Sequence, residues 1–181
     1  MSNTSQQYDE AAQSCRDIFE KKMKDYGSSW RILRISSITD QMYIKAKRIR
    51  SLEEKGVSRV DEGIEGEFKA IVNYGIMGMV QLEEGYSEET NLAAEEALNH
   101  YDHYIGVAKG LMENKNHDYD EAWREMRTSS LTDMILQKLL RTKQIEENKG
   151  KTLISEGIDA NYLDMINYAI FALIQLNEKA K

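Results

Sequence analysis

KMKDYGSSWRILRISSITDQMYIKAKRIRSLEE, residues 22–54, returns later in the chain as KNHDYDEAWREMRTSSLTDMILQKLLRTKQIEE, residues 115–147. The two segments are identical at 14 of 33 positions. A second matching pair follows, EGIEGEFKAIVNYGIMGMVQL from Glu62 and EGIDANYLDMINYAIFALIQL from Glu156. Self-similarity of this length at a nearly fixed spacing is the signature of a duplicated structural unit. We therefore predict two tandem repeats, residues 1–86 and 87–181.

The composition favours an all-α fold. The 181 residues contain no proline, and 41% are hydrophobic and 30% charged. Proline interrupts helices and marks turns, so its absence favours long helices, and this balance of apolar and charged residues suits amphipathic ones. Because one repeat alone would expose much of its apolar surface, we expect both repeats to share one helical bundle with a pseudo-twofold axis. The predicted helices cover about 6–24, 38–55 and 59–84, and then about 88–114, 131–148 and 155–179.

Serines followed by an acid three residues later predict the start of the middle helix in each repeat. Ser37 precedes Asp40 and Ser130 precedes Asp133. A serine at the N-cap accepts a hydrogen bond from a free backbone amide of the first turn. We expect these serines to cap the helices at 38–55 and 131–148.

Charge and cysteine content limit the function classes. A formal net charge of −7 disfavours attraction to a nucleic-acid backbone, so we expect no direct nucleic-acid partner. The single cysteine, Cys15, leaves no intramolecular disulfide, and the chain has neither a basic, apolar leader nor an apolar run long enough for a membrane. We expect a cytoplasmic protein. Phosphate-binding glycine loops and nucleophile elbows are absent from the sequence, which removes support for hydride transfer and covalent catalysis.

Acidic residues near the start of the last predicted helix of each repeat predict a Mg²⁺ site. Mg²⁺ prefers carboxylate oxygens and keeps water molecules that can contact substrate phosphates. The alternative is a solvated acidic helix start, which the helix dipole favours. The candidates are Glu62 and Glu65 in the first repeat and Glu156, Asp159 and Asp164, on one helix face, in the second.

Basic and aromatic residues that recur in both repeats are candidates for nucleotide binding. Lysine and arginine neutralise phosphates, and tyrosine and tryptophan stack on bases. The alternative is structural, with tryptophans in the core and arginines paired to acids. The second-repeat candidates are Lys115, Asn116, Asp118, Tyr119, Trp123, Arg124, Lys138, Arg141 and Asn167, and the first repeat offers Lys22, Tyr26, Trp30, Arg31, Lys45 and Arg48.

The two repeats differ at three of these places. Asn116, His117 and Asp164 of the second repeat are replaced by Met23, Lys24 and Ala70 in the first. Since polar and acidic groups provide ligand contacts, we expect metal and nucleotide binding to concentrate on the second repeat.

Several of these motifs resemble a known family, the nucleotide-modification-associated all-α proteins. They are the segment 115–119 with Trp123, the Lys138-x-x-Arg141 step and the stretch 156–168. That family is similar in turn to the MazG-like and dimeric dUTPase-like all-α nucleoside triphosphate pyrophosphohydrolases. Their signature is Glu-x-x-Glu followed by Glu-x-x-Asp around Mg²⁺.

The resemblance implies a Mg²⁺-dependent pyrophosphohydrolase acting on a canonical or modified nucleotide. Glu62-x-x-Glu65 and Glu156-x-x-Asp159 fit the two halves of the signature, although these halves lie in different repeats. In this hypothesis Glu156, Asp159 and Asp164 are catalytic. Two alternatives stand beside it: a nucleotide-binding or regulatory module without catalysis, and a structural helical protein that forms a homodimer.

Overall fold

The computed structural model describes residues 3–56 and 63–181, and these residues form six α-helices. The described residues contain no strand, so the all-α prediction is confirmed. The first repeat comprises α1 (Thr4–Tyr26), a short 3-10 helix η1 (Ser29–Ile32), α2 (Ile35–Lys55) and α3 (Ile64–Glu84). The second repeats this order with α4 (Ala94–Tyr119), η2 (Ala122–Glu125), α5 (Thr128–Glu147) and α6 (Ile158–Lys179).

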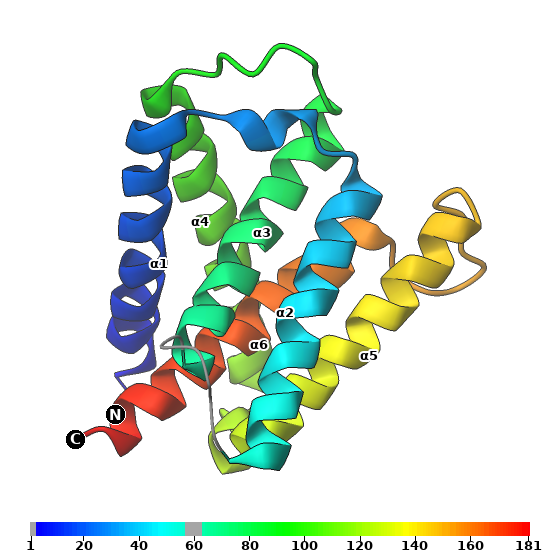
Figure 1. The fold of residues 1–181 in the computed structure, drawn as a ribbon. Helices are drawn as coiled ribbons and strands as arrows, with labels where there is room; N and C mark the ends of the chain where they lie inside the picture. Colours follow the sequence, from blue (N-terminus) through cyan, green and yellow to red (C-terminus); the bar gives the residue numbers. More distant parts are fainter. Residues whose placement is uncertain (1–2, 57–62) are drawn as a thin grey trace.

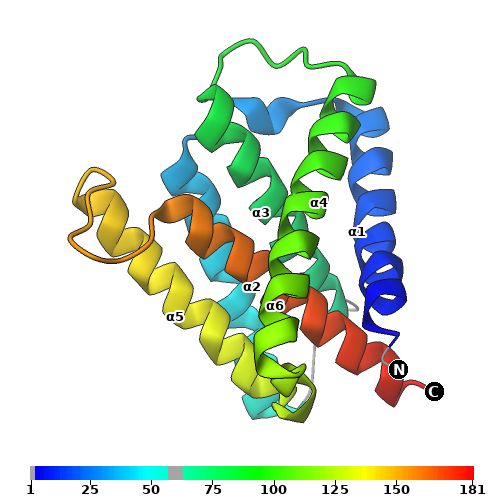
Figure 2. The ribbon, with the colours of Figure 1, turned by 180° about the vertical axis from the view of Figure 1, so that it is seen from behind.

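The helices pack in three layers, each of which pairs equivalent helices from the two repeats. Figure 1 shows α1 and α4 on one side, α3 and α6 crossing in the middle, and α2 and α5 on the other side. Figure 2 shows the same order from behind, with α4 in front of the crossing. Because α3 and α6 are covered on both sides, they contribute the largest share of buried side chains. Among the described residues, no helix is both long and apolar enough to cross a membrane.

Buried hydrogen bonds tie the first helix of each repeat to the last helix of the other. The Tyr8 hydroxyl of α1 donates to Asn167 Oδ1 of α6 at 2.7 Å, and the Tyr101 hydroxyl of α4 donates to Asn73 Oδ1 of α3 at 2.6 Å. Burial raises the pKa of both tyrosines above the ordinary value, so both remain protonated donors. The two repeats therefore satisfy each other's buried polar groups.

Two glutamines hold the 3-10 helices against the middle layer. Gln81 donates from Nε2 to the carbonyl oxygens of Leu33 and Arg31, at 2.6 and 2.9 Å. Gln175, its counterpart in α6, donates to the carbonyl oxygens of Met126 and Trp123. These bonds fix the segments that carry the two tryptophans.

Four predicted helix starts are wrong, including that of α6, which begins at Ile158 rather than near residue 155. The start predicted near residue 59 lies outside the described residues. The fourth helix begins at Ala94 rather than near residue 88, because the preceding segment is bound to the first repeat. The Ser28 hydroxyl donates to the Thr90 carbonyl and accepts from the Leu92 amide. The helices α2 and α5 begin at Ile35 and Thr128, directly after the 3-10 segments, so the capping prediction for Ser37 and Ser130 is also wrong.

Matching contacts between α2 and α5 place two glutamates in half-buried positions. Thr39 Oγ1 donates to Glu146 Oε2 at 2.8 Å, and Thr132 Oγ1 donates to Glu53 Oε2 at 3.1 Å. Burial raises the pKa of both glutamates, and the threonine hydrogen bonds only partly offset it. A folded pKa above the unfolded value means that ionisation at neutral pH destabilises the folded state.

We expect Glu53→Gln with Glu146→Gln to raise the melting temperature at pH 7 by about 2 °C, the effect of roughly 0.5–1 kcal/mol in a protein of this size. Glutamine keeps the acceptor for threonine but carries no charge. The gain should shrink as the pH falls through the folded pKa values towards about 4.3, the ordinary glutamate value, since the wild-type carboxylates then take up protons. Melting curves at pH 7 and 4.5 measure it, with the exposed Glu147→Gln as control. A pH-independent difference would contradict the prediction.

Candidate functional site

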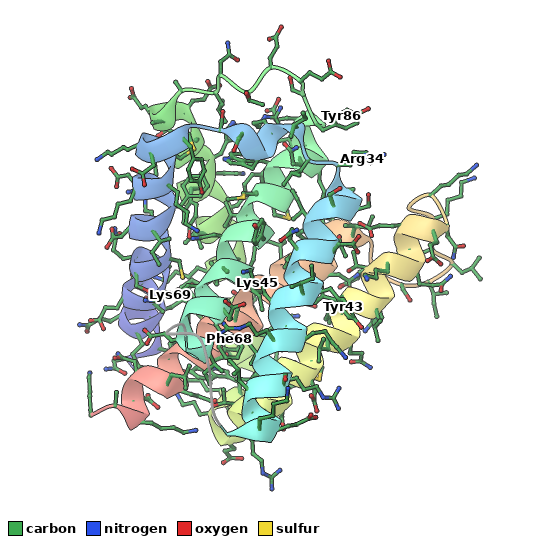
Figure 3. All side chains as sticks on the ribbon, in the orientation of Figure 1. Arg34, Tyr43, Lys45, Phe68, Lys69 and Tyr86 are labelled. Atoms are coloured by element: carbon green, nitrogen blue, oxygen red, sulfur yellow. The ribbon has the colours of Figure 1, made fainter. Side chains whose placement is uncertain are left out.

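A cavity of about 310 Å³ lies in the first repeat, between α1, η1, α2 and α3. Its size is at the lower end of the range for small-molecule sites, about 300–1,000 Å³. Figure 3 labels Lys45 and Lys69 on the two sides of α3. Among the described residues, the lining of the cavity combines lysines, aromatic rings and one carboxylate: Lys22, Lys45, Lys69, Phe19, Tyr26, Trp30, Tyr74 and Glu67.

Glu67 is the buried carboxylate of this cavity. Only 3% of the residue is exposed. Its Oε1 lies 3.1 Å from Arg48 Nη1, and its Oε2 lies 3.7 Å from Lys45 Nζ. Within the part of the chain that the structure describes, Oε2 has no hydrogen-bond donor. A buried acceptor without a donor costs about 1–3 kcal/mol, so Oε2 is suited to receive a hydrogen bond from a ligand.

The lysines give the cavity an excess of positive charge. Lys69 pairs with the exposed Glu65 at 3.3 Å, on the same helix. Lys22 is exposed and makes no ion pair with any residue that the structure describes. The one carboxylate in the lining, that of Glu67, is already shared between Lys45 and Arg48. An anionic group entering the cavity would therefore meet lysines that lack a full counter-charge.

The equivalent lysines of the second repeat surround a carboxylate of the chain itself. Asp164 is 6% exposed, and its two oxygens lie 2.8 Å from Lys115 Nζ and 3.0 Å from Lys138 Nζ. Partial burial lowers the pKa of Lys115, but the hydrogen bond and charge of Asp164 outweigh it, so this pKa is raised above its ordinary value. Lys115 and Lys138 match Lys22 and Lys45, whereas Asp164 matches Ala70.

The two tryptophans also differ in their surroundings. The Trp123 ring stacks on Phe171, with centroids 4.3 Å apart and planes at 4°, and the Arg124 guanidinium lies 4.5 Å from its centre. In the first repeat, Met77 takes the place of Phe171 and lines the cavity beside Trp30. Both tryptophans are buried to the same extent, with 6% of each exposed, so the repeats differ in which side chains lie against the ring and not in how far it is covered.

The predicted Mg²⁺ ligands do not come together in the described residues. Glu156 and Asp159 are exposed at the start of α6, Asp164 is held by two lysines, and Glu65 pairs with Lys69. Glu62 lies outside the described residues. Residues 3–56 and 63–181 contain no group of three His, Cys, Asp or Glu side chains placed to hold a metal ion. The Mg²⁺ site stays a prediction.

The remaining second-repeat candidates are spread over several surroundings. Tyr119 is 71% exposed and Asp118 lies beside His117 on the surface. Asn167 is buried, accepts from Tyr8 and donates to the Ala108 carbonyl, so its hydrogen bonds are structural. The other three have separate neighbours: Asn116 contacts Met112, Arg124 pairs with Glu178, and Arg141 is exposed. The structure thus brings together Lys115, Lys138 and Asp164 from this set.

The sequence analysis missed Glu67, Lys69 and Tyr74. The sequence contained a signal for Glu67. Asp164 of the second repeat is matched by Ala70, but one helical turn earlier Glu67 stands in the first repeat where the second has Asn161. Our expectation that ligand contacts gather on the second repeat stays a prediction, and the cavity described above lies in the first repeat.

Comparison with known proteins identifies the family of the chain. A family model described as nucleotide modification associated domain 1 matches residues 22–82 and again residues 115–176. No curated protein and no solved structure matches the chain. The two matched segments cover most of the chain, and each runs from the end of the first helix of a structural repeat into its last helix. The chain therefore belongs to the family of nucleotide modification associated domain 1, of which it carries two copies in tandem.

Proposed function

We propose that the protein binds a nucleotide in the cavity of the first repeat. The observation that carries this proposal is the lining itself, in which Lys22, Lys45 and Lys69 share a small cavity with aromatic rings. Lysines attract phosphate, and aromatic rings stack on bases. The family description, which names nucleotide modification, supports the same ligand class.

The aromatic wall has one accessible and several buried members. Tyr26 is 57% exposed at the end of α1, Tyr74 is half-buried on α3, and Trp30 is buried. A base entering between the tyrosines would gain stacking of about 1–3 kcal/mol, the range measured for base-aromatic contacts. Stacking tolerates every base, so it does not select among them.

Glu67 provides the polar contact that such a ligand needs. Glu67 lines the cavity, and its buried Oε2 has no hydrogen-bond donor among the described residues. Nucleotides carry hydroxyl groups on the sugar and, in most bases, amino or imino groups, and either kind would donate to this oxygen. Phosphate, ring and donor are the three chemical features that the lining would match.

Hydrolysis of the bound nucleotide with Mg²⁺ is the second candidate. It rests on the resemblance to MazG-like pyrophosphohydrolases and on the exposure of Glu156 and Asp159. Neither carboxylate makes an ion pair with a described residue, so both are accessible to a hard cation. Binding without catalysis is the better supported reading, because Asp164 is already neutralised by two lysines.

A thermal-shift panel of canonical and modified nucleoside mono-, di- and triphosphates tests the proposal. A ligand that binds only the folded state stabilises it by about 2.7 kcal/mol at one hundred times its Kd. We expect at least one nucleotide to raise the melting temperature. Lys22→Ala should weaken its binding about tenfold, the effect of losing one charge-assisted contact of roughly 1.5 kcal/mol.

The matched control is Lys21→Ala, an exposed neighbour outside the cavity lining, which should leave the affinity unchanged. Each nucleotide is also tested with Mg²⁺ while pyrophosphate release is measured, and Mg²⁺-dependent release would establish the second candidate. A panel without any stabilising nucleotide would overturn both candidates. If Lys22→Ala and Lys21→Ala changed the affinity equally, the nucleotide would not bind in this cavity.

A further inference from the structure

The two repeats place the same pair of lysines around different groups. In the second repeat, Lys115 and Lys138 hold the Asp164 carboxylate at 2.8 and 3.0 Å. In the first, Ala70 stands where Asp164 would be, and it lines the cavity together with Lys22 and Lys45. The second repeat therefore shows what the lysine pair holds when an anion is present.

We infer that the cavity of the first repeat holds the phosphate of its ligand between Lys22 and Lys45, in the place that Asp164 fills in the second repeat. In the second repeat, the carboxylate of Asp164 occupies the equivalent place and prevents a phosphate from binding there. The chain therefore binds one ligand. This inference rests on the proposed function for the identity of the ligand, but the phosphate position follows from the repeats alone.

Glu67 does not fill the place of Asp164 in the first repeat. It lies one helical turn earlier on α3, and its shorter ion pair, at 3.1 Å, is with Arg48. Its distance to Lys45 is 3.7 Å, longer than the 3.0 Å between Asp164 and Lys138. Lys45 is thus only loosely paired, and Lys22 is unpaired among the described residues.

The cavity of the first repeat also has more positive charge than the equivalent place in the second repeat. Three lysines, Lys22, Lys45 and Lys69, line the first cavity; Glu67 is shared between Lys45 and Arg48, and Glu65 pairs with Lys69. At the second place the position of Lys69 is taken by Leu163, and two lysines, Lys115 and Lys138, hold Asp164. The extra positive charge favours a dianionic phosphate at the first repeat over the monoanionic carboxylate seen at the second.

The tryptophan of the second repeat, Trp123, also has a different neighbour from its counterpart Trp30. Phe171 stacks on Trp123 with almost parallel rings, whereas the first repeat has Met77 at that position. Asp164 thus takes the place proposed for a phosphate, while Phe171 gives Trp123 a stacked ring where Trp30 has Met77.

Exchange of the residues at positions 70 and 164 tests the inference with inorganic pyrophosphate as the probe. Equilibrium dialysis measures its affinity and stoichiometry for the wild type, Ala70→Asp, Asp164→Ala and the double variant. We expect one pyrophosphate per chain in the wild type, at least tenfold weaker binding in Ala70→Asp, and two per chain in Asp164→Ala. The double variant should bind one, now in the second repeat.

Lys21→Ala is the matched control, since it lowers the net charge by the same amount outside the cavity lining and should keep the affinity within twofold. Asp164→Ala leaves Lys138 buried without its partner, so its melting temperature should fall and should rise again on adding pyrophosphate. An unchanged affinity in Ala70→Asp, or an Asp164→Ala protein that pyrophosphate neither binds twice nor restabilises, would overturn the inference.

The nucleotide panel separates this inference from the proposed function. If pyrophosphate follows the expected pattern but no nucleotide binds, the phosphate position stands and the proposed ligand class fails. If a nucleotide binds the wild type and Ala70→Asp equally well, the proposed function stands and the inference fails.

Discussion

Expressed separately, residues 1–86 and residues 87–181 are each expected to lack a stable monomeric fold. Separation would expose one side of the middle layer, where α3 packs on α6. It would also leave Asn73 and Asn167 without the hydroxyls of Tyr101 and Tyr8, at about 1–3 kcal/mol for each buried group left unpaired. These losses add to the exposed apolar layer, and both act against a typical domain stability of only about 5–15 kcal/mol.

Far-UV circular dichroism and size-exclusion chromatography measure the result. Co-expression of the two halves is the control, and we expect it to restore the helical content and the size of the full chain. A half that recovers helix only as a homodimer would agree with the prediction, because a second copy can supply the missing layer through the pseudo-twofold relation. Two well-folded monomeric halves would contradict it.

The all-α fold of two packed repeats was predictable because its cause lies in sequence periodicity. The duplicated segments and the absence of proline indicate equivalent helices, and their narrow apolar stripes require a common core. The start of α4 was not predictable in this way. Acidic and polar residues from 88 onward suit a helix, but the bonds of Ser28 to Thr90 and Leu92 hold that segment extended along η1, and such a tertiary contact has no local signal.

The site was predictable in its residue types but not in its arrangement. Recurrence singled out Lys22, Lys45, Lys115 and Lys138, and all four lie at the two equivalent places. Counting polar groups favoured the second repeat, because a sequence does not show that Asp164 is already neutralised. An unpaired carboxylate can bind a ligand, whereas a carboxylate already paired with the lysines of a site prevents a ligand from binding there. Only the distances between the carboxylate and the lysines distinguish these two cases.

The close crossing of α3 and α6 depends on the absence of side chains at two positions of α3. A Cβ atom added at Gly75 would lie 2.6 Å from Ile166 Cγ1, and one added at Gly78 would overlap the ring of Tyr162. Tyr162 is fully buried, and its hydroxyl lies 2.7 Å from Thr39 Oγ1, so the ring has no free space to move into. Small residues at a crossing let two helix backbones approach, and here they set the spacing of the middle layer.

We therefore expect Gly78→Ala to destabilise the protein by about 3 kcal/mol, since overpacking of a rigid core outweighs the gain in helix propensity of roughly 1 kcal/mol. The melting temperature should fall by about 6–12 °C in a chain of this length. Gly106→Ala is the control, because a Cβ there meets no atom within 4 Å and should stabilise α4 slightly. Tyr162→Leu should reduce the cost of Gly78→Ala when the two are combined, as expected for residues in contact. Equal melting temperatures for Gly78→Ala and Gly106→Ala would mean that the two central helices are not held at this distance by Gly78.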